Sequence, residues 1–211
     1  MNRDTAVASV ARRLGNRTNL NTDIIAEMQV MQSVLERDLT LRPWFLLTDV
    51  ESLSTTSGEE KVQLPSDFLY EGEETGLFWY DASVSENNWT ELVKVDYDDA
   101  VSFYNAKTGS PEAYALVGNY FRIYPTPDAA YTFKCIYYAA DTVLSSNIEN
   151  QWLKYAPQLL IAETGMTMAG YLQNKIAHGF FKGLRDSERS RVAIENTSRE
   201  WTGRELIMGG A

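Results

Sequence analysis

The residue types that most often carry enzyme chemistry are scarce in this chain of 211 residues, which holds one cysteine and one histidine. A thiolate nucleophile needs a base beside it, so Cys135 and His178 would have to meet in the fold. Cys135 lies within an alternating, strand-like segment, whereas His178 lies in a helical pattern. Buried structural roles are more usual for both residue types. These two residues alone complete neither a disulfide nor a zinc site, so we expect no catalytic dyad and no metal.

Carboxylates are more plentiful and offer a second route to chemistry. Two acidic clusters stand out: Glu71, Glu73 and Glu74, and Asp96, Asp98 and Asp99. Glycoside hydrolysis needs two carboxyl groups about 5–10 Å apart across a cleft, and a hydrolase using Glu71 or Glu74 is one hypothesis. The second cluster lacks the glycine expected at the sixth position of a calcium loop. Both patterns are more typical of solvated loop charges. The segment Lys107–Ser110 lacks the upstream glycine of a phosphate loop, so we expect no cofactor.

The net charge of −10 is confined to the middle of the chain. Residues 1–50 are balanced, residues 51–149 carry five bases against seventeen acids, and residues 150–211 carry eight bases against six acids. An acidic middle repels phosphates and disfavours a nucleic-acid-binding face there. The simplest interpretation of such a block is solubility and spacing.

Helical patterns occupy the N-terminal part of the chain. One helix is predicted over residues 4–14, and a second runs from about residue 22 to residue 39. The second has apolar residues at intervals of three and four, which predict a core-facing stripe: Ile24, Ile25, Met28, Met31, Val34 and Leu35. Pro43 ends this section, and residues 44–47 are predicted to start an extended segment.

Strand patterns and aromatic residues cluster in the middle. Strands are predicted over residues 60–64, 76–81, 89–95, 113–117, 120–124 and 131–138, with a helical turn from Asp96 to Tyr104 that Asp96 caps. The pair Gly118-Asn119 between two apolar runs predicts a tight hairpin. We expect its two strands and the strand over 131–138 to form an antiparallel meander.

The last third is helical again. Asn150 can cap a short turn, Pro157 suits the first turn of a helix to about residue 172, and a long helix follows to about residue 198. The charged residues of the long helix are typical of a solvated outer face: Lys182, Arg185, Asp186, Glu188 and Arg189. The final residues, 201–211, carry apolar side chains that indicate either a surface for a partner or a docked or frayed terminus.

This order predicts an α+β fold, with a helical bundle formed by the N- and C-terminal helices and an inserted antiparallel β domain. Residues 1–45 would supply the N-terminal helices, 46–149 the β-rich domain, 150–198 the C-terminal helices and 199–211 a tail. The polar N-terminus is followed by no apolar segment of a secretory signal. No apolar run approaches the roughly 20 residues needed to span a bilayer, so we expect no membrane contact.

Five segments in this order resemble the head-to-tail adaptor (connector) proteins of tailed bacteriophages, especially short-tailed ones. They are LRPWFL at 41–46, LPSDF at 64–68, YALVGNYFRIYPTP at 114–127, YYA at 137–139 and WL at 152–153, before a helical pair. The resemblance covers about residues 20–195. It implies a structural, non-enzymatic virion protein at the head–tail junction, made in the host cytoplasm. It also implies a ring, usually of twelve copies, that docks under the portal, receives the tail nozzle or other tail proteins and takes part in genome retention and ejection.

The same resemblance implies partner contacts in the C-terminal segment. In related adaptors this segment reaches the portal, so the expected portal contacts are Trp201, Arg204, Leu206, Ile207 and Met208. DNA would pass through the ring without sequence-specific binding, and an acidic middle facing the channel would let it slide. The alternative is a tail-associated carbohydrate- or receptor-binding β module, in which Trp79, Tyr80 and Trp89 would stack on sugar rings.

Overall fold

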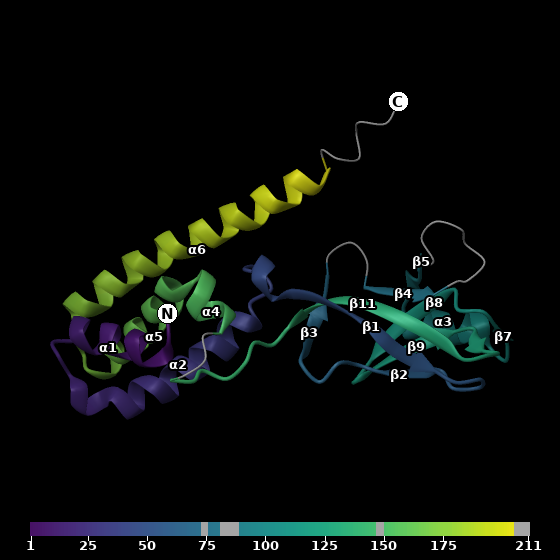
Figure 1. Cartoon of the computed structure of the whole chain (residues 1–211), viewed down its shortest axis with the longest axis horizontal. Coiled ribbons are helices and arrows are strands. Elements are labelled where there is room, and N and C mark those ends of the chain that lie inside the picture. Colours follow the sequence, from purple (N-terminus) through teal and green to yellow (C-terminus); the bar gives the residue numbers. More distant parts are fainter. Residues whose placement is uncertain (73–75, 81–88, 147–149, 205–211) are drawn as a thin grey trace. The chain divides into compact units, whose positions relative to one another are not determined.

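The computed structural model describes residues 1–72, 76–80, 89–146 and 150–204, the last five of these as backbone only (Figure 1). The chain divides into two compact units. A helical unit comprises Met1–Leu46 and Ala140–Ala211, and a β unit comprises Leu47–Ala139. The predicted α+β class, with terminal helices around an inserted antiparallel β region, is confirmed.

The N-terminal helices form where the sequence predicts them. They are α1 (Arg3–Arg13), the 3₁₀ turn η1 (Thr18–Leu20), α2 (Asn21–Glu36) and the 3₁₀ turn η2 (Trp44–Leu46). The turn η2 replaces the extended start predicted at residue 44, and the strand begins at Leu47. On α2, Ile24, Met28 and Leu35 are buried, but Val34 is exposed. The prediction that Val34 faces the core was therefore wrong, because it lies one residue, or about 100°, away from Leu35 around the helix.

The C-terminal helices are α4 (Gln151–Tyr155), α5 (Pro157–Tyr171) and α6 (Lys175–Arg204). Asn150 caps α4 and Pro157 begins α5, as predicted. Helix α5 is the centre of the helical unit: α1, α2, α4 and α6 all pack against it, and its residues from Leu159 to Gly165 are buried. Gly165 lets α6 approach closely, because the ring of Phe181 lies where a side chain at this position would stand.

Strands of the β unit form two principal sheets in the part of the chain that the structure describes. The first has the order β1–β11–β4–β5, with β3 also paired to β11; the second has the order β2–β9–β8–β6. The strands of the first are β1 (Leu47–Thr55), β3 (Phe68–Glu71), β4 (Leu77–Tyr80), β5 (Trp89–Glu91) and β11 (Tyr131–Ala139). Those of the second are β2 (Lys61–Gln63), β6 (Val93–Lys94), β8 (Ala113–Val117) and β9 (Tyr120–Tyr124).

Shorter elements connect these strands. Helix α3 (Tyr97–Tyr104) follows its cap Asp96, and β7 (Thr108–Gly109) pairs in parallel with β10 (Thr126–Pro127). The hairpin of β8 and β9 around Gly118-Asn119 is confirmed, with Val117 opposite Tyr120. Side chains from both principal sheets share one core cluster, in which Phe121 and Ile123 meet Phe133 and Cys135.

Two predictions about the strands were wrong. The predicted meander of β8, β9 and β11 does not form. Strand β11 does not pair with β9; it lies in the first sheet and pairs with β1, β3 and β4. The single strand predicted over residues 89–95 is broken at the buried Leu92, so that β5 pairs with β4 and β6 pairs with β8 in the second sheet. Pairing between distant segments, which local alternation does not specify, decides both outcomes.

Candidate interaction surfaces

The two residues of the hypothetical nucleophilic dyad lie in different units and different surroundings. Cys135 is buried in β11 of the β unit, and burial raises the pKa of its thiol to about 12, which keeps it protonated and unreactive. His178 is exposed on α6 of the helical unit. Cys135 therefore has the character of a core side chain.

Glu71 is part of the β-unit framework. Its carboxylate accepts a hydrogen bond from the hydroxyl of Tyr114 at 2.7 Å and forms an ion pair with Lys94. Burial of Tyr114, together with this hydrogen bond, raises the pKa of the phenol. Glu73 and Glu74, the other acids of this cluster, lie outside the described residues. The described geometry of Glu71 fits a structural cross-link between β3, β6 and β8.

The second acidic cluster lies at the N-terminus of helix α3. Asp96 Oδ1 accepts a hydrogen bond from the backbone N–H of Asp98 at 3.0 Å, and Asp98 and Asp99 lie in the first turn of α3, where carboxylates suit the helix dipole. Within the described residues, no group of three His, Cys, Asp or Glu side chains is placed to hold a metal ion. The same residues include no helix long and apolar enough to cross a bilayer.

The aromatic side chains proposed for sugar stacking pair with other rings. Trp79 packs edge-on against Tyr131, with ring centroids 5.3 Å apart. Tyr80 and Trp89 lie opposite each other on β4 and β5 and are 5.6 Å apart in a similar arrangement. Trp79 is thus part of the sheet face, while Tyr80 keeps an exposed edge.

Helix α6 is fixed to the helical unit by a charged junction. Arg189 Nη1 donates to Asp38 Oδ2 at 2.7 Å, and its Nε and Nη2 donate to Glu163 Oε1 at 2.9 and 2.8 Å. Burial raises the pKa of Asp38, but hydrogen bonds from Thr40 and Arg189 outweigh burial and leave this pKa below its ordinary value. The prediction that Arg189 belongs to a solvated charged face was therefore wrong, since it joins α6 to α5 and to the end of α2.

Further along α6, Asn196 holds the segment that leads toward the β unit. Its side-chain N–H groups donate to the carbonyls of Leu41 at 2.6 Å and Arg42 at 3.0 Å, and its carbonyl accepts from the backbone N–H of Trp44 at 3.0 Å. The guanidinium of Arg199 lies over the Trp44 ring, 3.4 Å from its centroid. Asn196 and Arg199 therefore anchor this part of α6 along one side.

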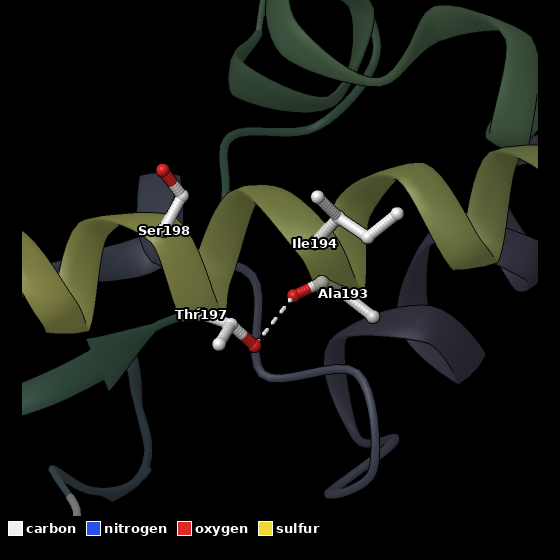
Figure 2. Close-up of a pocket in the computed structure, with 4 residues that line it drawn as sticks. All are labelled: Ala193, Ile194, Thr197 and Ser198. Carbon is white, nitrogen blue, oxygen red and sulfur yellow. Dashed lines mark hydrogen bonds between the residues drawn. The ribbon is translucent and has the colours of Figure 1, made fainter.

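The outer side of α6 carries apolar residues that the helical unit does not bury. Ile176 is 89% exposed, Phe180 is 54% exposed and Ile194 is 69% exposed. Ile194 borders a hollow of about 430 Å³ lined with Ala193, Thr197 and Ser198, shown in Figure 2. Ile176 and Phe180 border a second hollow of about 450 Å³ beside the end of α1. Apolar side chains exposed along one helix are typical of a surface that a protein partner covers.

Helix α2 has a smaller face of the same kind. Val30 and Val34 are each 52% exposed and lie one turn apart, with the exposed residues Ala26 and Ser33 on the same side. The sequence contains the signal for this face, because Val30 and Val34 are four residues apart and out of phase with the buried Ile24, Met28 and Leu35. It was missed because Val34 was assigned to the core stripe.

The proposed portal contacts lie at and beyond the end of α6. Trp201 and Arg204 belong to its last turns, since the helix continues to Arg204 rather than ending near residue 198. Their side chains, and the whole of Leu206, Ile207 and Met208, lie outside the described residues.

Comparison with known families decides the identity of the chain. The family model described as SU10 adaptor protein matches residues 1–204, nearly the whole sequence. The chain belongs to the SU10 adaptor protein family. No curated protein in the comparison matches the chain. The adaptor is therefore a phage head-to-tail adaptor, and this family membership implies a place at the head–tail junction, oligomerisation and interaction with portal and tail components.

Proposed function

We propose that the adaptor closes into a ring, most simply of twelve copies, between the portal and the tail, where it completes the neck, retains the packaged DNA and lets it pass. The protein acts by binding other proteins, without catalysis. A ring of identical copies needs head-to-tail contacts that close by rotation, so each copy needs two different faces. The observation that carries the proposal is the line of exposed apolar residues on α6, at Ile176, Phe180 and Ile194.

The portal side of the ring is assigned to the end of α6 and the residues after it. Trp201 and Arg204, with Leu206, Ile207 and Met208, combine an aromatic ring, a guanidinium and three flexible apolar side chains. Trp and Arg are enriched among the residues that dominate binding energy in protein interfaces, Met is also enriched there, and Leu206 and Ile207 add apolar area. The junctions at Arg189 and Asn196 support this assignment, because they hold α6 in place up to the residues that would enter the portal.

The acidic block of residues 51–149 is proposed to face the channel. Its net charge of −12 repels the phosphates of passing DNA and prevents the counterion release that drives nonspecific binding. Transit would then depend little on DNA sequence. Acidic residues spread evenly over the outside of an assembled ring would contradict this part of the proposal.

The ring function is tested by mixing the full-length adaptor with the portal protein of the same phage and measuring mass by size-exclusion chromatography with light scattering. The adaptor alone is expected to be a monomer, and the mixture is expected to form a stable high-order assembly. Alanine at Leu206, Ile207 and Met208 together should abolish portal binding. Val143→Ser, which removes an apolar residue that is also exposed in the helical unit, should not. Glycan binding by the isolated protein, without portal binding, would favour the β-module alternative.

A further inference from the structure

The outer faces of α2 and α6 match each other in length and residue size. On α6, exposed residues recur at intervals of three and four and are mostly small before Ile194: Gly183, Ser187, Ser190, Ile194 and Thr197. On α2, the exposed positions recur in the same way over the same length: Asp23, Ala26, Val30, Val34 and Arg37. The first and last residues of each stripe are 14 positions apart, which corresponds to about 21 Å along a helix. The small residues of α6 leave room for the valines of α2.

Both faces point away from the centre of the helical unit. Helices α2 and α6 each pack against α5 through their buried sides, which carry Met28 and Leu35 on α2 and Phe181 and Val192 on α6. The outer stripe of one helix therefore has no access to the outer stripe of the other within the same copy. In Figure 1 the two helices run from the same end of the helical unit. Rotation by roughly 30°, which relates neighbours in a twelve-fold ring, can therefore place the start of α2 in one copy beside the start of α6 in the next.

Charges at the ends of the two stripes are complementary in this parallel arrangement. Asp23 begins the α2 stripe and Arg37 ends it, 14 residues later. On α6, Lys182 precedes Glu195 by 13 residues. Within the described residues Asp23 and Lys182 form no ion pair, whereas Arg37 donates to the carbonyl of Ser33 and Glu195 pairs with Arg191 of its own helix at 2.8 Å. An alignment of Asp23 with Lys182 brings these two opposite charges together and leaves Arg37 level with Asn196, one residue after Glu195.

We propose, on the basis of the ring function proposed above, that the occupant of the α6 face is the α2 face of the neighbouring copy. In this contact Val34 packs against Ile194, Val30 lies over Ser190, and the two helices run parallel. The contact joins two different surfaces, so each copy offers α2 on one side and α6 on the other and the chain of contacts can close by rotation. A second copy fits better than another protein because each chain carries both of the matching surfaces, the α2 stripe and the α6 stripe.

Paired cysteines test this contact directly, because a disulfide requires Cα atoms within about 7 Å. The variant Val34→Cys/Ile194→Cys is oxidised as the full chain mixed with the portal, where the ring is expected to form, and is then separated by size under denaturing conditions. We expect a ladder of covalent oligomers from the double variant, none from either single variant, and only dimers from a mixture of the two single variants. Cys135 is retained because it is buried. Val143→Cys/Ile194→Cys, which pairs Ile194 with an exposed residue outside the contact, should give no ladder.

The outcomes separate this contact from the ring itself. Covalent dimers from Ile194→Cys alone would mean that two α6 faces meet, which contradicts the proposal. A ring seen by light scattering, without a ladder from the double variant, would overturn the α2–α6 contact and leave the ring function intact. Absence of any ring, with or without portal, would refute both.

A charge reversal provides an independent test. Lys182→Glu places a negative charge beside Asp23, and each contact should weaken by roughly two- to fivefold, as expected for an exposed ion pair. Weakening is repeated at every contact of the ring, so the protein concentration needed for assembly should rise. Asp23→Lys in the same chain should restore assembly. Failure of this second change to restore assembly, with both variants folded, would contradict the proposed alignment.

Discussion

Gly165→Ala should destabilise the helical unit although alanine favours helices. A Cβ at this position would overlap three atoms of the Phe181 ring, and Phe181 is completely buried, so the ring cannot rotate into solvent. Helices α5 and α6 must then separate. Overpacking of this kind costs about 1–3 kcal/mol, and the severe overlap argues for the upper end. The higher helix propensity of alanine offsets about 1 kcal/mol of this destabilisation. The expected net loss in the free energy of unfolding is therefore about 2 kcal/mol.

Chemical denaturation measures this loss, and the same helix supplies the control. Gly170 lies in α5, where a Cβ would have open space beyond its own stretch of helix, so Gly170→Ala should be neutral or stabilising by up to about 1 kcal/mol. Phe181→Leu in the Gly165→Ala background should recover about 1 kcal/mol relative to the sum of the single changes, since the two side chains are in contact. Equal effects of Gly165→Ala and Gly170→Ala would refute the close-packing explanation.

Three further changes test the polar junctions. Asp38→Asn should lower the free energy of unfolding by about 1–3 kcal/mol at neutral pH. Folding lowers the pKa of Asp38, so the stability that its carboxylate contributes is complete above the unfolded pKa of 3.8 and disappears as the pH falls through the folded pKa. The stability curves of the wild type and the variant should therefore converge in acid. Asn196→Ala should cost about 1–2 kcal/mol and increase amide hydrogen exchange at Trp44; unchanged exchange there would contradict the junction. Tyr114→Phe should cost about 1 kcal/mol in denaturation of the β unit, whereas a stabilising effect would show that its bond to Glu71 contributes nothing.

Local sequence patterns predicted the helices well because their signals are local. The cap at Asn150, the proline that begins α5 and the cap at Asp96 each act within one turn, so position and element type follow directly from the residues. The turn at Gly118-Asn119 fixed the β8–β9 hairpin in the same way. Alternation predicted β11 as a strand, but not its partners.

The sheet order and the surfaces depended on contacts that no local pattern specifies. The break at Leu92, which sends β5 and β6 to different sheets, follows from burial of Leu92 between them. Arg189 has the spacing of a solvated charge and is nevertheless held by Asp38 and Glu163. The exposed face of α2 could have been recognised from the phase of Val30 and Val34, whereas its relation to α6 became apparent only after both helices were placed against α5.

The central claim, that this adaptor exists to assemble with itself on a portal, is tested most directly by native mass spectrometry of the portal before and after addition of the adaptor. A mass gain equal to twelve chains of 23.9 kDa each, with no smaller stable complex, is the predicted result. A portal whose mass does not change in the presence of excess folded adaptor would contradict the account.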